Sequence, residues 1–161
     1  MKPALLCLAL LVGPAQAVEP GQPAPDIALP RSTLPASQLS ALRGQWVYLD
    51  FWASWCGPCR QSFPWMSALQ QKYGPRGLQV LAVNVDAKQS DADAFLARTP
   101  AGFALAFDPK GEAPRRFAIQ GMPSSVLIDP QGQVRWVHKG FRPDEAAALE
   151  ARIAAALEAK P

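Results

Sequence analysis

Two cysteines separated by two residues, Cys56 and Cys59, carry the clearest chemical signal in this sequence. They follow an almost continuous apolar and aromatic run from Trp46 to Trp52 and precede helically spaced apolar residues that end at Tyr73. Cys56 is therefore predicted to lie where a buried strand ends and a helix begins. Unpaired N–H groups and the dipole of a helix start stabilise a negative sulfur, whereas a free thiol has a pKa of about 8.5. We predict that Cys56 attacks a substrate disulfide and that Cys59, one turn further on, resolves the mixed disulfide.

Residues close to the cysteine pair bear on this chemistry. Gly57 and Pro58 give the helix a tight start, because proline is tolerated where an N–H has no intrahelical partner. Trp55 is either an apolar rim for docking partners or a packing residue, and we favour the rim. Asp50, six residues before the first cysteine in the apolar strand, is interpreted as a buried general base for the second cysteine. Burial without a cationic partner raises the pKa of such a carboxyl. The alternative is a buried aspartate whose oxygens are satisfied by hydrogen bonds.

A Cys-x-x-Cys pair is also half of a zinc site, but zinc needs four ligands. Outside the first 17 residues the chain offers only His138 besides the two sulfurs, so we expect no metal and no cofactor. A Cu(I)-binding metallochaperone that uses the two thiolates and His138 remains an alternative. Otherwise His138 is expected to be a solvated side chain on an edge-like strand.

The first 17 residues are predicted to be a cleaved export signal, which leaves residues 18–161 as one domain. Lys2 gives a short basic region, residues 4–12 are apolar, and Ala15-Gln16-Ala17 fits a cleavage site. The apolar run is too short to span a membrane. Cys7 belongs to this leader, so the exported chain keeps only the reactive pair and has no structural disulfides. We therefore expect a periplasmic location and no membrane span after cleavage.

The composition is that of a globular protein, with 49% hydrophobic and 18% charged residues. The net charge is +3 without a run of basic residues, so we expect no nucleic-acid partner. Strands are predicted at 46–52, 78–85, 103–107, 124–128 and 134–138, with a further edge strand at 26–29. Helices are predicted at 56–73, 91–98 with Ser90 as N-cap, 113–118 and from Pro143 onward, and a short helix or turn at 37–42. This order implies an α/β fold with a mixed sheet and helices on both faces.

The segment from Asp50 to Cys59, Asp-Phe-Trp-Ala-Ser-Trp-Cys-Gly-Pro-Cys, closely resembles the active-site segment of the thioredoxin superfamily. Pro64 matches that family's helix-kinking proline, Gly121-Met122-Pro123-Ser124 its cis-proline loop, and Gly140 its glycine after the last strand. The leader and the extra helix and strand at about 90–107 point to the TlpA/ResA-like branch of periplasmic thiol–disulfide oxidoreductases. The resemblance implies a thioredoxin-like fold with this helix–strand insertion and a short N-terminal extension.

The resemblance also implies roles for individual residues. Met122 and Pro123 would place backbone beside the first cysteine to pair with an extended substrate, with a cis bond between them. Ser62 departs from the branch because many members have a glutamate there. Ala82 is aligned with the lysine that accompanies the buried aspartate in ordinary thioredoxins, so Asp50 is expected to lack that partner.

The resemblance makes a dithiol–disulfide oxidoreductase that reduces periplasmic proteins the leading hypothesis. Its partners would be protein disulfides or thiols and a membrane thiol–disulfide donor, and we expect a monomer. An oxidant remains open, because the direction depends on the potential relative to the compartment. A redox-inert binding module is disfavoured because both cysteines are retained. The physiological substrate cannot be read from these residues.

Overall fold

The computed structural model describes residues 18–159, which form one five-stranded sheet with helices around it. The sheet order is β3-β2-β1-β4-β5, in which β1, β2 and β3 are parallel and β4 and β5 antiparallel to their neighbours. The expected mixed sheet is confirmed. The elements in chain order are η1 (Leu39–Leu42), β1 (Trp46–Trp52), α1 (Gly57–Tyr73), η2 (Gly74–Arg76), β2 (Leu78–Asn84), α2 (Gln89–Leu96), β3 (Ala104–Phe107), α3 (Glu112–Arg116), β4 (Ser124–Ile128), β5 (Val134–Lys139), η3 (Pro143–Glu145) and α4 (Ala146–Glu158).

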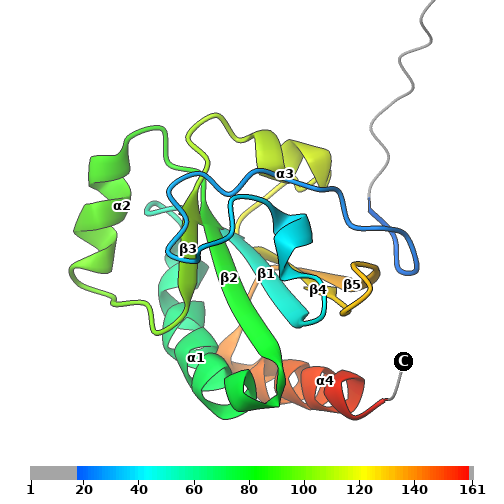
Figure 1. The fold of residues 1–161 in the computed structure, drawn as a ribbon. Coiled ribbons are helices and arrows are strands. Elements are labelled where there is room, and N and C mark those ends of the chain that lie inside the picture. The colour runs from blue at the N-terminus through cyan, green and yellow to red at the C-terminus, as the bar shows by residue number, and fades with distance from the viewer. Residues whose placement is uncertain (1–17, 160–161) are drawn as a thin grey trace, which may run out of the picture.

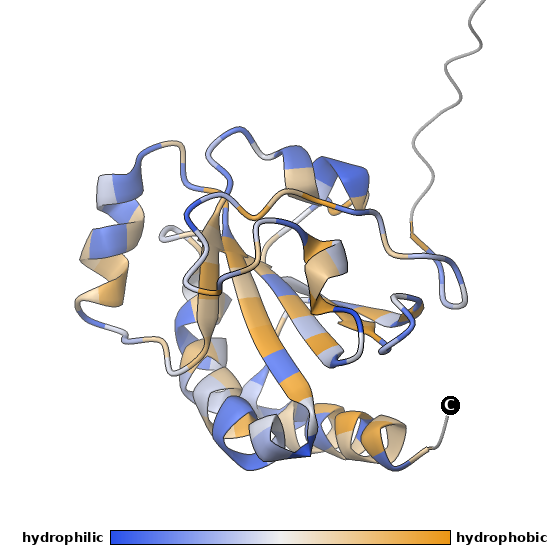
Figure 2. Ribbon diagram, viewed as in Figure 1, coloured by the Kyte–Doolittle hydropathy of each residue, from blue (hydrophilic) through white to orange (hydrophobic). Residues whose placement is uncertain are grey.

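Two hydrophobic layers cover the two faces of the sheet. Helices α1 and α4 lie together on one side, whereas η1, α3 and the N-terminal segment lie on the other (Figure 1). We call these the α1/α4 face and the η1/α3 face. Figure 2 shows that the strands are mostly apolar while α3 is largely hydrophilic, as expected for a short helix that buries only one side.

Strand β1 is central and buried on both faces, which is why its sequence is nearly continuously apolar. Side chains alternate along a strand, so Tyr48, Asp50 and Trp52 face α1 and α4. Val47 and Phe51 belong to the η1/α3 layer. The only acid in this strand therefore lies under the helix that begins with the cysteine pair.

The N-terminal segment does not form the predicted edge strand at 26–29. Only an isolated bridge joins Ala28 to Gln38, and the Asp26 carboxylate accepts hydrogen bonds from the N–H and hydroxyl of Ser40. Because Pro30 has no N–H, the hydrogen-bonding pattern of a strand cannot continue beyond Leu29. Residues 30–33 instead cover the edge of β3, where the Thr33 N–H donates to the Leu105 carbonyl at 2.9 Å.

The predicted N-cap role of Ser90 is wrong. Helix α2 begins at Gln89 with Lys88 as N-cap, and Ser90 lies inside the first turn. The other predicted bounds shift by one or two residues, and the last helix begins as the 3₁₀ turn η3 before α4. Local sequence fixes the existence of these elements better than their ends.

An irregularity in the pairing of β4 and β5 changes which side chains of β5 face α1 and α4. Ile128 pairs with Val134, but Leu127 pairs with Trp136, so β5 carries one extra residue between them. Val134 accordingly packs in the η1/α3 layer and Trp136 in the α1/α4 layer. Beyond this bulge, His138 lies directly opposite Ser125.

Residues 1–17, interpreted above as an export signal, lie outside the described residues. Within residues 18–159, no helix combines the length and the apolar character needed to cross a membrane.

We expect the aromatic cluster under α1 to dominate stability. The Phe63 ring centroid lies 4.8–5.0 Å from the rings of Trp52, Phe95 and Phe103. Phe63→Ala should lower the free energy of unfolding by about 3–5 kcal/mol, because it leaves a cavity in a fully buried site. Urea titration of the oxidised protein measures this, with Trp55→Ala at an exposed site as the control, expected within about 1 kcal/mol of wild type. A Phe63→Ala loss no larger than that of the control would contradict the packing described here.

Candidate active site

Cys56 and Cys59 form a disulfide at the start of α1. Cys56 is the N-cap residue in an extended backbone conformation, and its sulfur accepts a hydrogen bond from the Cys59 N–H at 3.2 Å. The predicted helix-start position is confirmed. Cys56 is 4% exposed and Cys59 is fully buried, so Cys56 is the sulfur that a partner can reach. Ser62, one turn on, donates its hydroxyl hydrogen to the Cys59 carbonyl at 3.1 Å and offers no carboxylate.

The loop that joins β1 to α1 is held by a polar network that the sequence did not indicate. The Asp86 carboxylate, just after β2, accepts hydrogen bonds from the Ser54 N–H at 2.9 Å and the Ser54 hydroxyl at 3.0 Å. The Asn84 side-chain amide donates to the same carboxylate at 2.7 Å. The Cys56 N–H donates to the Ala53 carbonyl. The only available signal was the position of Asp86, because parallel β1 and β2 end at the same edge of the sheet.

The surface around the disulfide is apolar. Trp55 is 70% exposed, the only large hydrophobic side chain so exposed in the described part of the chain, and Gly57 and Pro58 are exposed beside it. The expected exposure of Trp55 is confirmed. Trp52 is buried instead, as predicted.

The segment at Met122 and Pro123 lies at the same end of the sheet. Their peptide bond is cis, as expected. Ser124, the first residue of β4, pairs with Phe51 near the end of β1, which brings this loop to the edge where the disulfide lies. The loop is fastened by the Gly140 N–H, which donates to the Pro123 carbonyl at 2.8 Å.

Asp50 is a buried acid with unused hydrogen-bonding capacity. It is 2% exposed, and its Oδ2 has no hydrogen-bond partner within residues 18–159. Burial raises the pKa of this carboxyl well above its ordinary value. Its cross-strand neighbours are Ala82 and Ser125, so the alignment that placed alanine opposite the acid is confirmed. The raised pKa lets this carboxyl hold a proton at a pH where exposed aspartates have lost theirs.

His138 is not the solvated side chain that the sequence suggested. Its side chain is 20% exposed, and its Nε2 lies 3.7 Å from the Glu145 carboxylate. Burial lowers the pKa of His138, the Glu145 charge opposes this, and the Arg152 charge adds to it. In residues 18–159, no three His, Cys, Asp or Glu side chains are grouped closely enough to hold a metal ion. The structure therefore does not group His138 with the cysteines.

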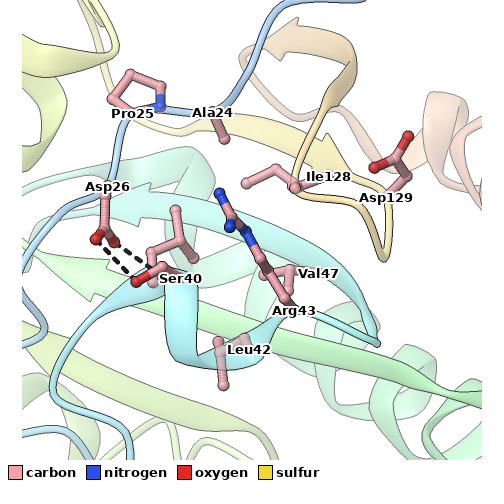
Figure 3. A pocket seen from close by; sticks show the side chains of 11 residues that line it. Ala24, Pro25, Asp26, Ser40, Leu42, Arg43, Val47, Ile128 and Asp129 are labelled. Carbon is pink, nitrogen blue, oxygen red and sulfur yellow. Dashed lines mark hydrogen bonds between the residues drawn. The ribbon is translucent and has the colours of Figure 1, made fainter.

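A surface depression of about 340 Å³ lies away from this chemistry. It is lined by the N-terminal segment, η1 and the nearby ends of β1 and β4, and the Asp26–Ser40 hydrogen bonds form one wall (Figure 3). Arg43 extends over Val47 and Ile128, both of which belong to the η1/α3 layer. The depression contains none of the predicted site residues.

Known proteins are similar to this chain in sequence. The thiol–disulfide oxidoreductase ResA of Oceanobacillus iheyensis is 32% identical over 124 residues, which are 74% of this chain and 65% of that protein. The chain thus spans less than two thirds of that relative's length. ResA of Geobacillus kaustophilus is also 32% identical, over 77% of this chain and 71% of that protein.

Solved structures agree with the fold. A crystal structure from Chlorobium tepidum, assigned as a thiol:disulfide interchange protein DsbE, has a TM-score of 0.83 and 56% identity over 88% of this chain and 99% of that one. A solution structure from Bacteroides thetaiotaomicron, assigned as a protein disulfide isomerase, has a TM-score of 0.77 and 28% identity over 88% of this chain and 92% of that one. The fold of this chain and its Cys56–Cys59 pair are those of the thioredoxin-like thiol–disulfide oxidoreductases. The profile of the AhpC/TSA family matches residues 20–137, and the chain belongs to that family.

The burial of Asp50 predicts a pH-dependent stability. Its pKa is higher in the folded protein than in the unfolded chain, so the folded state binds more protons between those two values. The free energy of unfolding should therefore fall as the pH rises from about 4, the pKa of an aspartate in the unfolded chain, up to the raised pKa of the folded protein. Asp50→Asn should remove this fall and exceed wild type in stability at the upper end of the range.

Urea titrations across this pH range measure the effect. Asp91→Asn, at an exposed acid of α2, is the matched control and should keep the wild-type slope. Parallel pH profiles for wild type and Asp50→Asn would show that the carboxyl is not buried in the folded state as described.

Proposed function

We propose that this chain is an exported thiol–disulfide oxidoreductase that reduces disulfides of periplasmic proteins. The observation that carries the proposal is the position of Cys56 as N-cap of α1, where its sulfur already accepts a backbone N–H and is the reachable member of the pair. A helix start lowers the pKa of a thiol, so the reduced protein would present a thiolate at neutral pH. The leader-like pattern of residues 1–17 supports export.

The reaction proceeds in two exchanges. The Cys56 thiolate attacks one sulfur of the substrate disulfide, which forms a mixed disulfide and releases the other substrate sulfur as a thiolate. Cys59 then loses its proton to Asp50 and attacks the Cys56 sulfur. The bond between Cys56 and the substrate breaks, the second substrate sulfur leaves as a thiolate, and the Cys56–Cys59 disulfide forms. The substrate gains two electrons and the pair loses two, and a membrane thiol–disulfide donor would reduce the pair again.

Asp50 is suited to this proton transfer by its position and environment. It lies on the sheet face that α1 covers, the face towards which Cys59 is buried. Its unpartnered Oδ2 and raised pKa let it accept a proton from a thiol and hold it while the thiolate attacks.

The apolar surface at Trp55 is proposed to dock the protein substrate. With Gly57 and Pro58 it borders the reachable sulfur, and the Met122–Pro123 segment lies at the same edge of the sheet. An extended substrate segment that pairs with this backbone would place its disulfide at Cys56.

The direction of electron flow is tested by the equilibrium redox potential against glutathione. A value near that of thioredoxin, about −270 mV, is expected for a reductant, and insulin should be reduced in a turbidity assay. A value near that of DsbA, about −120 mV, would replace the proposal with an oxidant.

Asp50→Asn is expected to slow resolution by Cys59 by on the order of 100-fold while the first attack by Cys56 changes little, because only resolution needs the base. Stopped-flow measurement of mixed-disulfide formation and decay separates the two steps. Cys59→Ser is the reference, since it should trap the mixed disulfide completely. Equal slowing of both steps in Asp50→Asn would refute the base role.

Trp55→Ala should raise KM for a protein disulfide by about tenfold, as expected for an exposed aromatic at a docking surface. The rate with glutathione disulfide should stay within about twofold, because that small substrate does not need the docking surface. Steady-state assays with both substrates provide the comparison. A matching loss with glutathione disulfide would place Trp55 in the chemistry and not in docking.

A further inference from the structure

Three polar residues lie side by side across three strands of the sheet. Asp50 of β1 pairs with Ser125 of β4, and Ser125 pairs with His138 of β5. Residues directly opposite on antiparallel strands point to the same face, with Cβ atoms about 4.5–5.5 Å apart. The three side chains therefore form one row on the α1/α4 face, which we call the polar row.

The atoms of the polar row have unused capacity for hydrogen bonds. The Tyr48 hydroxyl donates to Ser125 Oγ at 2.8 Å, which leaves the Ser125 hydrogen free to turn towards a neighbour. Asp50 Oδ2 and His138 Nε2 are buried and have no partner among the described residues. Buried polar atoms normally have partners, and the other two atoms without one are the indole nitrogens of Trp52 and Trp65 in the same layer. Among the described residues, Asp50 and His138 are the orphaned groups that can gain or lose a proton, so their place in one row calls for a functional reason.

Aromatic side chains surround the polar row, so its members are the polar groups between Asp50 and the surface at His138. Tyr48 is packed edge-on between Trp65 and Trp136, at centroid distances of 5.6 and 6.0 Å. At the other end, His138 Nε2 lies 3.7 Å from the Glu145 carboxylate of η3, and the charge of Arg152 in α4 acts on it from a distance. Ser125 and His138 are thus the polar neighbours of Asp50 across the strands, and rotation of the Ser125 hydroxyl and the two flanking side chains would be needed to join them by hydrogen bonds.

The proposed reaction leaves a proton on Asp50 after each resolution, and that proton must leave before Asp50 can act again. We propose that Ser125 and His138 carry protons between Asp50 and solvent, with Tyr48 holding the Ser125 hydroxyl in place. This inference rests on the role of Asp50 in the proposed function. Ser125 and His138 act on Asp50 and do not touch the substrate.

The transfer is balanced as a shift of protons along the row. The Asp50 carboxyl gives its proton to Ser125 Oγ while the Ser125 hydrogen moves to the His138 imidazole, and the imidazolium then releases a proton to water beside Glu145. No bond between heavy atoms changes. The lowered pKa of His138 agrees with this, because burial keeps the imidazole neutral and able to accept a proton.

Time-resolved infrared spectroscopy after a pH jump tests the route on the oxidised protein. The carbonyl stretch of protonated Asp50, identified by its loss in Asp50→Asn, reports when this carboxyl loses its proton. His138→Gln should slow that loss by about tenfold or more, because it removes the group that accepts the proton from Ser125. Lys139→Gln, at the exposed neighbouring position of β5, is the matched control and should keep the wild-type rate.

Ser125→Ala provides a second, independent break in the row and should slow the loss similarly. Wild-type rates in either variant, at unchanged melting temperature, would overturn the proposal. This failure is distinct from failure of the base role: a proton route can be absent while Asp50→Asn still slows resolution selectively. A merely structural role for His138 would lower the melting temperature without changing the infrared rate, which would also overturn the proposal.

Discussion

The hydrogen bond from the Cys59 N–H to the Cys56 sulfur sets the chemistry of the whole molecule. It exists because β1 ends at Trp52, residues 53–55 follow, and Cys56 caps the start of α1, where the Cys59 N–H has no carbonyl partner within the helix. The loop keeps its shape through the Asp86 carboxylate at the neighbouring strand end. The reactivity of the Cys56 sulfur therefore depends on the parallel strands β1 and β2 ending at the same edge of the sheet, where Asp86 can hold the loop before the cysteine.

The buried carboxyl of Asp50 is the second constraint. It needs an environment opposite to the one that the Cys56 sulfur needs. A thiolate needs donors and a partly open surface, whereas a base with a raised pKa needs the absence of both. The fold meets the two demands by separating them along β1. Cys56 lies beyond the strand end, and Asp50 lies under α1 with Ala82 opposite it, where a small apolar side chain supplies no charge.

The residues that could be predicted from the sequence are those whose signal is local. The apolar run of β1, the helical spacing of α1 and the cysteine spacing placed the pair and its acid correctly. The position of Ala82 opposite Asp50 came instead from the resemblance to thioredoxins. The Asp86 network could not be predicted, because it depends on contact between loops 32 residues apart. Lys88 as the N-cap of α2 was missed because lysine is not a preferred N-cap residue, whereas Ser90, two positions later, is one.

His138 was misjudged because a lone histidine on an edge-like strand was expected to be solvated, whereas η3 covers this part of β5 and places Glu145 3.7 Å from its Nε2. Strand β5 also has a bulge. The bulge adds one residue, Arg135, to β5. Val134 and Trp136 therefore pack in opposite layers although they are two positions apart in the sequence. Removing Arg135 would restore strict alternation and keep the Leu127–Trp136 and Ser125–His138 pairs, because Val134 and Trp136 would then be adjacent and adjacent side chains point to opposite faces. The turn before β5 sets where this pairing starts, since the Asp129 carboxylate accepts hydrogen bonds from the N–H groups of Gln131 and Gln133. The bulge then absorbs one residue, so the end of β5 faces Ser125 whatever side chain stands at position 135.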